Sequence, residues 1–130
     1  MKRDFDLIRA ILLDIEKNVP AVPDELGYHF DHEDQDSVAY ALYLMAQKGL
    51  IEDAYNIGDH GTHEADSYGH PKLTWDGCVF LDTVRDEEIW RKTKLGVANA
   101  GSFSFDLLKA LAKGLIKTKI EQHTGLELNL

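Results

Sequence analysis

The chain has 130 residues, of which 44% are hydrophobic, and its 23 Asp and Glu against 14 Lys and Arg give a formal net charge of −9. This length and composition fit one compact domain, or one small domain with a helical extension, and exclude a chain that is disordered throughout. No apolar run reaches the roughly 18 residues of a membrane span, no signal-peptide core follows Met1, and a single cysteine excludes an intrachain disulfide framework, so we expect a cytoplasmic protein without membrane contact.

Two helices are predicted in the first 50 residues. The first has Asp4 as its N-cap and ends before Pro20 and Pro23, since proline cannot continue a helix; its apolar residues recur at helical spacing as Phe5, Ile8, Leu12, Ile15 and Val19. Residues 21–32 show no clear pattern, although residues 27–30 could be extended. The second helix begins at Asp34 or Asp36 and ends at Gly49, with an inner face of Val38, Leu42, Met45 and Ala46.

A β-hairpin is predicted next. Residues 51–57 alternate apolar and polar side chains as a half-buried strand does, and the returning strand passes through Leu73. The Gly- and His-rich residues 58–70 between them have no apolar rhythm, so we expect them to form an exposed loop.

Helices are again predicted from Thr74 onward. Thr74 is suited to cap a helix whose packing stripe is Gly77, Phe80, Leu81 and Val84, and Gly77 lets that helix lie close to a neighbour. Asp86 begins a fresh helix or marks a kink, and Ile89, Trp90, Thr93 and Val97 carry the pattern onward. The last helix, residues 105–122, has a wide apolar stripe of Leu107, Leu108, Leu111, Leu115, Ile116 and Ile120.

This order of elements predicts an α+β fold. Residues 1–84 are interpreted as a winged helix-turn-helix, in which a small antiparallel hairpin forms the wing, and residues 85–130 as a two-helix C-terminal extension. The wide stripe of the last helix leaves two alternatives open. The extension either packs on the N-terminal domain or pairs with the same helix of a second chain, forming a homodimer.

Several stretches of the chain point together to one family. They are Met1-Lys2-Arg3-Asp4, Asp6-Leu7-Ile8-Arg9, Ile11-Leu12-Leu13, Gly49-Leu50-Ile51-Glu52, Leu73-Thr74-Trp75-Asp76-Gly77, Phe80-Leu81-Asp82, Arg85-Asp86, Ile89-Trp90, Lys92-Thr93-Lys94, Gly101-Ser102 and the run from Phe105 to Leu111. With these stretches the chain resembles domain of unknown function 2513, an uncharacterised family that occurs mostly in bacteria and their phages. The resemblance covers nearly the whole chain in order and implies a winged-helix layout, but it implies no activity and no catalytic residue.

The second predicted helix carries the candidate binding residues. It lies where a winged helix presents its recognition helix, and its outward side chains suit either DNA or a protein partner: Gln35, Ser37, Tyr40, Tyr43, Gln47 and Lys48. Charge disfavours nucleic acid, because residues 1–84 contain 6 Lys and Arg against 17 Asp and Glu, whereas residues 85–130 contain 8 against 6. Glu33, Asp34 and Asp36 also gather at the helix end that would enter the major groove.

Three other sets of residues indicate a function more weakly. His60, His63 and His70 share one loop and supply nitrogen donors, but their spacing matches no closed four-ligand motif, so we expect neither a metal nor another cofactor. Cys78 is interpreted as a small core residue rather than a nucleophile. Trp75 and Trp90 are either interface anchors or, the favoured reading, residues that lock the C-terminal extension onto the N-terminal domain.

The sequence therefore predicts a non-enzymatic protein. No nucleophile elbow, phosphate-binding glycine loop or dinucleotide fingerprint is present in it. The leading hypothesis is an accessory protein of phage or prophage type that acts through protein–protein contacts. The alternative is a DNA-binding transcriptional regulator that uses the second helix and the wing.

Overall fold

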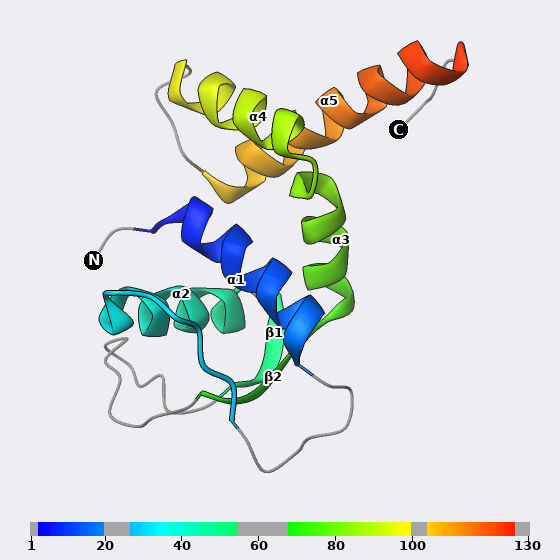
Figure 1. The fold of residues 1–130 in the computed structure, drawn as a ribbon. Helices are drawn as coiled ribbons and strands as arrows, with labels where there is room; N and C mark the ends of the chain where they lie inside the picture. Colours follow the sequence, from blue (N-terminus) through cyan, green and yellow to red (C-terminus); the bar gives the residue numbers. More distant parts are fainter. Residues whose placement is uncertain (1–2, 20–26, 55–67, 100–103, 127–130) are drawn as a thin grey trace. The chain divides into compact units, whose positions relative to one another are not determined.

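The computed structural model describes residues 3–19, 27–54, 68–99 and 104–126 (Figure 1). The elements in chain order are α1 (Phe5–Asn18), α2 (Gln35–Gln47), β1 (Ile51–Ala54), β2 (Gly69–Leu73), α3 (Trp75–Val84), α4 (Glu87–Asn99) and α5 (Phe105–Thr124). These helices and the small antiparallel sheet of β1 and β2 confirm the α+β class. The chain divides into two compact units, Met1–Leu81 and Asp82–Leu130. This division lies within α3, and the boundary predicted after residue 84 lies at the C-terminal end of the same helix.

Helix α1 supplies much of the core of the first unit. Its N-cap is Asp4, as predicted, whose side chain accepts a hydrogen bond from the Leu7 N–H at 3.0 Å. It ends before Val19, which is extended because it precedes Pro20. The buried residues lie on one face of the helix and are Phe5, Leu7, Ile8, Ile11, Leu12 and Ile15.

Helix α2 begins at Asp34 rather than Asp36. The Asp34 Oδ1 accepts hydrogen bonds from the N–H groups of Asp36 at 3.1 Å and Ser37 at 3.4 Å. Gly49 follows the helix with φ at +78°, a left-handed conformation that glycine adopts without a Cβ clash. Three of the four predicted inner residues are buried, but Ala46 is exposed. The prediction for Ala46 was wrong. Ala39, seven residues earlier on the same side of α2, is fully buried, but this side is uncovered in the last turn of the helix, where Ala46 lies.

The predicted hairpin is confirmed. β1 and β2 pair antiparallel, with Ile51 opposite Leu73 and Glu52 opposite Lys72. An irregularity follows, where Asp53 takes a φ of +64° and Ala54 lies opposite Gly69. Strand β1 ends at Ala54, whereas the predicted strand continued to residue 57; residues 55–57 lie outside the described part of the chain.

The exposed loop predicted for residues 58–70 was wrong at its C-terminal end. Tyr68 is fully buried, and Gly69 and His70 belong to β2. The Tyr28 N–H donates to the Gly69 carbonyl at 2.7 Å and the Tyr68 N–H donates to the Tyr28 carbonyl at 2.9 Å. The unpatterned segment around Tyr28 is thus attached to β2, because burying two large aromatic rings outweighs the loop-like local composition.

Helix α3 starts against the turn that follows α2. The Thr74 hydroxyl caps the helix by accepting from the Gly77 N–H at 3.0 Å, and it also donates to the Gly49 carbonyl. The Thr74 N–H donates to the Leu50 carbonyl at 3.0 Å. The Cα of Gly77 lies so close to the Leu50 carbonyl oxygen that any Cβ would collide with it. The predicted close approach at Gly77 is therefore confirmed.

The second unit contains α4 and α5, which pack against each other (Figure 1). Asp86 caps a separate helix, α4, by accepting a hydrogen bond from the Ile89 N–H at 3.0 Å, so a new helix begins there rather than a kink. The predicted residues Ile89, Trp90, Thr93 and Val97 are all buried. Ser104 caps α5, and Gly125 ends it with a left-handed φ of +71°.

The apolar stripe predicted for α5 is only partly covered. Leu108 is fully buried, whereas Leu107 is 38% and Ile120 is 40% exposed. Leu111, Leu115 and Ile116 are half-buried. Within the described residues, no helix has the length and apolar character needed to cross a membrane.

Candidate functional site

The N-terminal end of α2 presents three carboxylates. Glu33, Asp34 and Asp36 are all exposed. A hydrogen bond from the Ser37 hydroxyl, at 2.7 Å, lowers the pKa of Asp34 below its usual range, so this carboxylate stays ionised at neutral pH. Negative charge here stabilises the helix dipole, and the same charge repels a phosphate backbone.

Gln35 and Ser37, two of the six candidate binding residues on α2, are bonded to residues around the start of this helix. The Gln35 Nε2 donates to the carbonyls of Phe30 and His32, each at 3.0 Å, and its Oε1 accepts from the Tyr68 hydroxyl at 3.1 Å. Burial raises the pKa of Tyr68 to about 12, so its hydroxyl remains a donor at neutral pH. Ser37 is likewise bonded to Asp34. These side chains hold the start of α2 against the preceding segment and the chain entering β2.

The other four candidates follow one another along the outer side of α2. The rings of Tyr40 and Tyr43 are stacked with centroids 6.2 Å apart, and the Gln47 Nε2 donates to the Tyr43 hydroxyl at 3.5 Å. Lys48, at the helix C-terminus, is exposed. We call Tyr40, Tyr43, Gln47 and Lys48 the α2 ridge. Its residues combine two aromatic faces with polar ends, a composition that suits a macromolecular contact.

The outer face of α3 has an unexpected composition. Trp75 is 83% exposed, Val79 is 39% exposed and Cys78 is exposed. The prediction that Cys78 is a core residue was therefore wrong, and Trp75 lies outside the core of its own unit. At about 100° per residue, Gly77 and Phe80 point to the opposite side of the helix and occupy the buried position instead. We call Trp75, Cys78 and Val79 the α3 outer face.

Trp90 behaves differently from Trp75. Its side chain is only 4% exposed, and the Lys94 ammonium lies 5.7 Å from the centre of its ring. Trp90 is therefore buried, as its place in the apolar pattern of α4 predicts, and a cation lies over its ring. Its predicted contact with the N-terminal domain stays a prediction.

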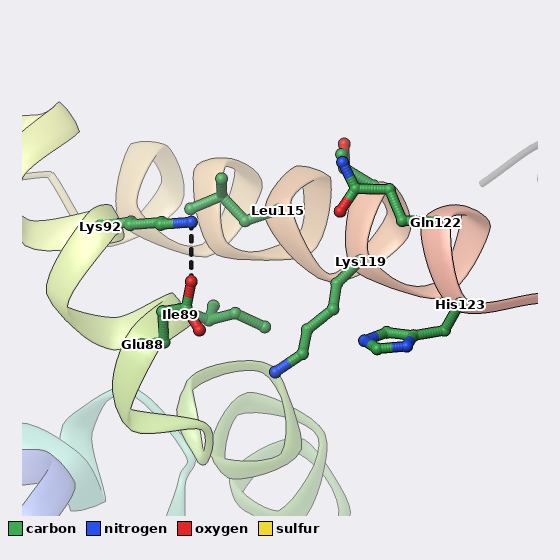
Figure 2. Close-up of a pocket in the computed structure, with 8 residues that line it drawn as sticks. Glu88, Ile89, Lys92, Leu115, Lys119, Gln122 and His123 are labelled. Atoms are coloured by element: carbon green, nitrogen blue, oxygen red, sulfur yellow. Dashed lines mark ion pairs between the residues drawn. The ribbon is translucent and has the colours of Figure 1, made fainter.

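The second unit contains a cleft of about 220 Å³ between α4 and α5 (Figure 2). Ile89 and Leu115 supply its apolar surface, and two ammonium groups border it. The Lys92 Nζ lies 2.9 Å from the Glu88 Oε1, and the Lys119 Nζ lies 2.7 Å from the Asp86 Oδ2. The remaining lining residues are Thr118, Gln122 and His123.

The charges of the cleft are those of structural ion pairs. The Asp86 carboxylate raises the pKa of Lys119, while Lys119 lowers the pKa of Asp86 and Lys92 lowers the pKa of Glu88. Each shift favours the charged form of its group, as expected when a carboxylate and an ammonium are paired. The Asp86–Lys119 pair joins the N-cap of α4 to α5, whereas the Glu88–Lys92 pair lies within α4.

The candidate metal ligands are only partly described. His70 lies half-buried in β2, whereas His60 and His63 fall outside the described residues. In the described ranges, no group of three His, Cys, Asp or Glu side chains is placed to hold a metal ion.

Comparison with known proteins gives a family but no activity. The model of the family described as "Hypothetical protein (DUF2513)" matches residues 2–104. A protein of Haemophilus influenzae, described as uncharacterized, is 32% identical over 117 residues, which are 89% of this chain and 96% of that protein. No solved structure matches this chain. The resemblance inferred from the motifs is thereby confirmed, and the chain belongs to the DUF2513 family.

Proposed function

We propose that this protein acts without catalysis, by contacting a protein partner through an N-terminal unit with a winged-helix layout. The observation that carries the proposal is the start of α2, the end that a winged helix would insert into the major groove. It exposes Glu33, Asp34 and Asp36, while the side chains of Gln35 and Ser37 are bonded within the fold. Such a surface repels phosphate and suits a protein contact.

The finer parts of the proposal have separate support. The winged-helix layout is supported by the order α1, α2, β1, β2, α3 with an antiparallel hairpin. A role as a phage or prophage accessory protein follows from the family resemblance alone. A cytoplasmic location is consistent with an exposed single thiol, Cys78, which a reducing compartment would preserve.

A pull-down compared with nucleic-acid chromatography tests the main proposal. The tagged protein is incubated with nuclease-treated bacterial lysate, and separately applied to heparin and to mixed duplex DNA at low salt. We expect retained proteins in the first experiment and no retention in the second. Capture of no protein, together with retention on DNA that falls steeply with salt, would contradict the proposal.

DNA-binding regulation is the second candidate function, and the α2 ridge favours it. Tyr40 and Tyr43 stack, Gln47 is bonded to Tyr43, and exposed Lys48 adds a positive charge. If the ridge contacts DNA, Lys48→Glu weakens binding at low salt. The matched control is Lys17→Glu, which makes the same charge change at an exposed position on α1. Equal effects of both variants would mean that any binding is non-specific.

Homodimerisation through α5 is proposed as a further mode of protein contact. Its support is the exposure of Leu107 and Ile120 on a helix whose stripe is only partly covered. If α5 pairs with a second copy, Ile120→Glu shifts the mass measured by light scattering from two chains to one. A wild-type protein with the mass of one chain would exclude this mode.

A further inference from the structure

The α3 outer face lies beside two residues whose roles in the fold are visible. Thr74 caps the helix and Gly77 permits its contact with the Leu50 carbonyl. Trp75 lies between them in sequence, yet 83% of its surface is exposed, so its indole adds little to the core. Isolated exposed apolar residues are common on proteins. Trp75, Cys78 and Val79, however, are spaced i, i+3 and i+4 and form one continuous patch.

The charge around this patch specifies the kind of partner it suits. Asp76 is exposed next to Trp75, and Glu52 is exposed on β1 of the same unit, where Lys72 pairs with Asp53 at 3.8 Å. Residues 1–81 contain 6 Lys and Arg against 16 Asp and Glu. The face of an indole also attracts cations, because its π electrons present negative charge. Both the ring and its surroundings therefore favour a cationic ligand and disfavour an anionic one.

We propose that the α3 outer face docks an apolar, lysine- or arginine-bearing segment of a partner protein, such as one side of an amphipathic helix. The apolar side chains would cover Trp75 and Val79, and the cations would meet the indole face and Asp76. Exposed tryptophan is the residue most enriched among those that dominate binding energy at protein interfaces. This inference rests on the proposed function, since it assumes that the chain acts through protein contacts, and it adds where the contact is and what chemistry it selects.

Synthetic peptides test the charge preference. The probe is a dye-labelled amphipathic helix of leucine and lysine, and its matched control has glutamate at every lysine position. Fluorescence anisotropy at physiological ionic strength should show that the lysine peptide binds and the glutamate peptide does not. Equal binding of the two peptides, or binding of neither, would overturn the inference.

Variants test the location. Trp75→Ala should weaken binding of the lysine peptide roughly ten-fold or more, and Val79→Ser by a smaller factor. The controls are Leu95→Ala, which removes another large exposed apolar side chain, 55% exposed on α4, and Glu87→Gln, which removes an exposed carboxylate of α4. Both should change binding less than about two-fold. If the controls weaken binding as much as Trp75→Ala does, the peptide is held by general charge and the inference fails.

The single thiol gives a test without altering Trp75. Cys78 is exposed within the patch, so its sulfur can add to a bulky maleimide. The modified protein should lose the lysine peptide, whereas Cys78→Ser treated with the same reagent should keep it. Retained binding after complete modification would place the peptide elsewhere.

Two further outcomes separate this inference from the proposed function. If the lysate pull-down captures the same proteins with Trp75→Ala as with the wild type, the inference is wrong and the proposed function stands. If the wild type forms oligomers that Trp75→Ala dissolves in light scattering, the occupant is a second copy of this chain, and a separate partner is excluded.

Discussion

The first turns of α2 and α3 make an instructive comparison. Each begins with a side-chain cap, Asp34 in one and Thr74 in the other. At the start of α2, the polar Gln35 looks available for a ligand, but three hydrogen bonds join it to Phe30, His32 and Tyr68. At the start of α3, the apolar Trp75 looks like a core residue, but it is exposed. At both helices, residue type alone therefore mispredicts which side chain is bonded within the fold and which is exposed.

The difference arises from what each helix meets. The start of α2 lies beside a segment without regular structure, whose carbonyl groups need donors and find them in the Gln35 amide. The start of α3 meets the turn at Gly49 and Leu50, which needs a hydroxyl donor and a residue without a side chain. Thr74 and Gly77 meet that requirement, whereas Trp75 on the opposite side of α3 is 83% exposed.

Among the variants at the starts of α2 and α3, the largest loss of stability is expected where α3 meets the turn at Gly49 and Leu50. Gly77→Ala places a Cβ against the backbone carbonyl of Leu50, which cannot give way as a flexible side chain can. We expect the free energy of unfolding to fall by about 2 kcal/mol or more, measured by urea denaturation. The control is Gly114→Ala, where a Cβ meets nothing within 4 Å, and it should stabilise α5 by up to about 1 kcal/mol. Equal effects of the two variants would show that α3 does not lie against Leu50.

The next effect distinguishes a structural Gln35 from a ligand-binding one. Gln35→Ala removes the donor for two carbonyls and one of two acceptors of the Tyr68 hydroxyl, which keeps the Gln35 backbone carbonyl at 3.3 Å. We expect a loss of about 1–3 kcal/mol in urea denaturation. Gln47→Ala, at an exposed position on the same helix, should change stability by less than about 0.5 kcal/mol. If Gln35→Ala is neutral, Gln35 becomes available again as a binding residue.

A smaller effect is expected from pH at the cap of α2. The pKa of Asp34 is lowered in the folded protein, so its contribution to stability is present above the unfolded pKa, near 4, and is lost as the pH falls through the folded pKa. Asp34→Asn keeps a good capping residue without a titrating group. The variant should lose less stability than the wild type between neutral pH and about pH 3, followed by thermal denaturation. Parallel pH profiles would contradict the assigned pKa shift.

The smallest effect on stability is expected at the α3 outer face. Trp75→Ala should change the free energy of unfolding by less than about 0.5 kcal/mol, because the indole is exposed. Trp90→Ala is the contrast, with an expected loss of about 3–5 kcal/mol, because that ring is buried. A large loss from Trp75→Ala would mean that the ring packs inside and would remove the basis for a docking face.

Features set by local sequence were predictable. The caps at Asp4, Thr74 and Asp86 and the left-handed Gly49 depend on residues within one turn, and the structure confirms them. The antiparallel hairpin was also predictable. Its precise extent was not, because Tyr68 is placed by contacts with Tyr28 and Gln35, which are more than 30 residues away in the chain.

The candidate site was less predictable. A helical projection of α3 places Cys78 nearly opposite Phe80 but only about 60° from Leu81, so the sequence contains just a partial signal of its exposure. The exposure of Trp75 had no signal in the sequence beyond that projection, since tryptophan at a helix start packs inward in many proteins. The bonds of Gln35 depend on backbone carbonyls in a segment without periodicity, and no pattern of residues reports them.

The edge of strand β2 also restricts how a partner can bind. Strand β2 contains Pro71, which has no N–H to donate, and Tyr28 already occupies the backbone groups of Tyr68 and Gly69. An incoming extended peptide would find too few backbone donors and acceptors on β2 to form a ladder. Strand addition at β2, and with it open-ended stacking of chains through this edge, is thereby disfavoured.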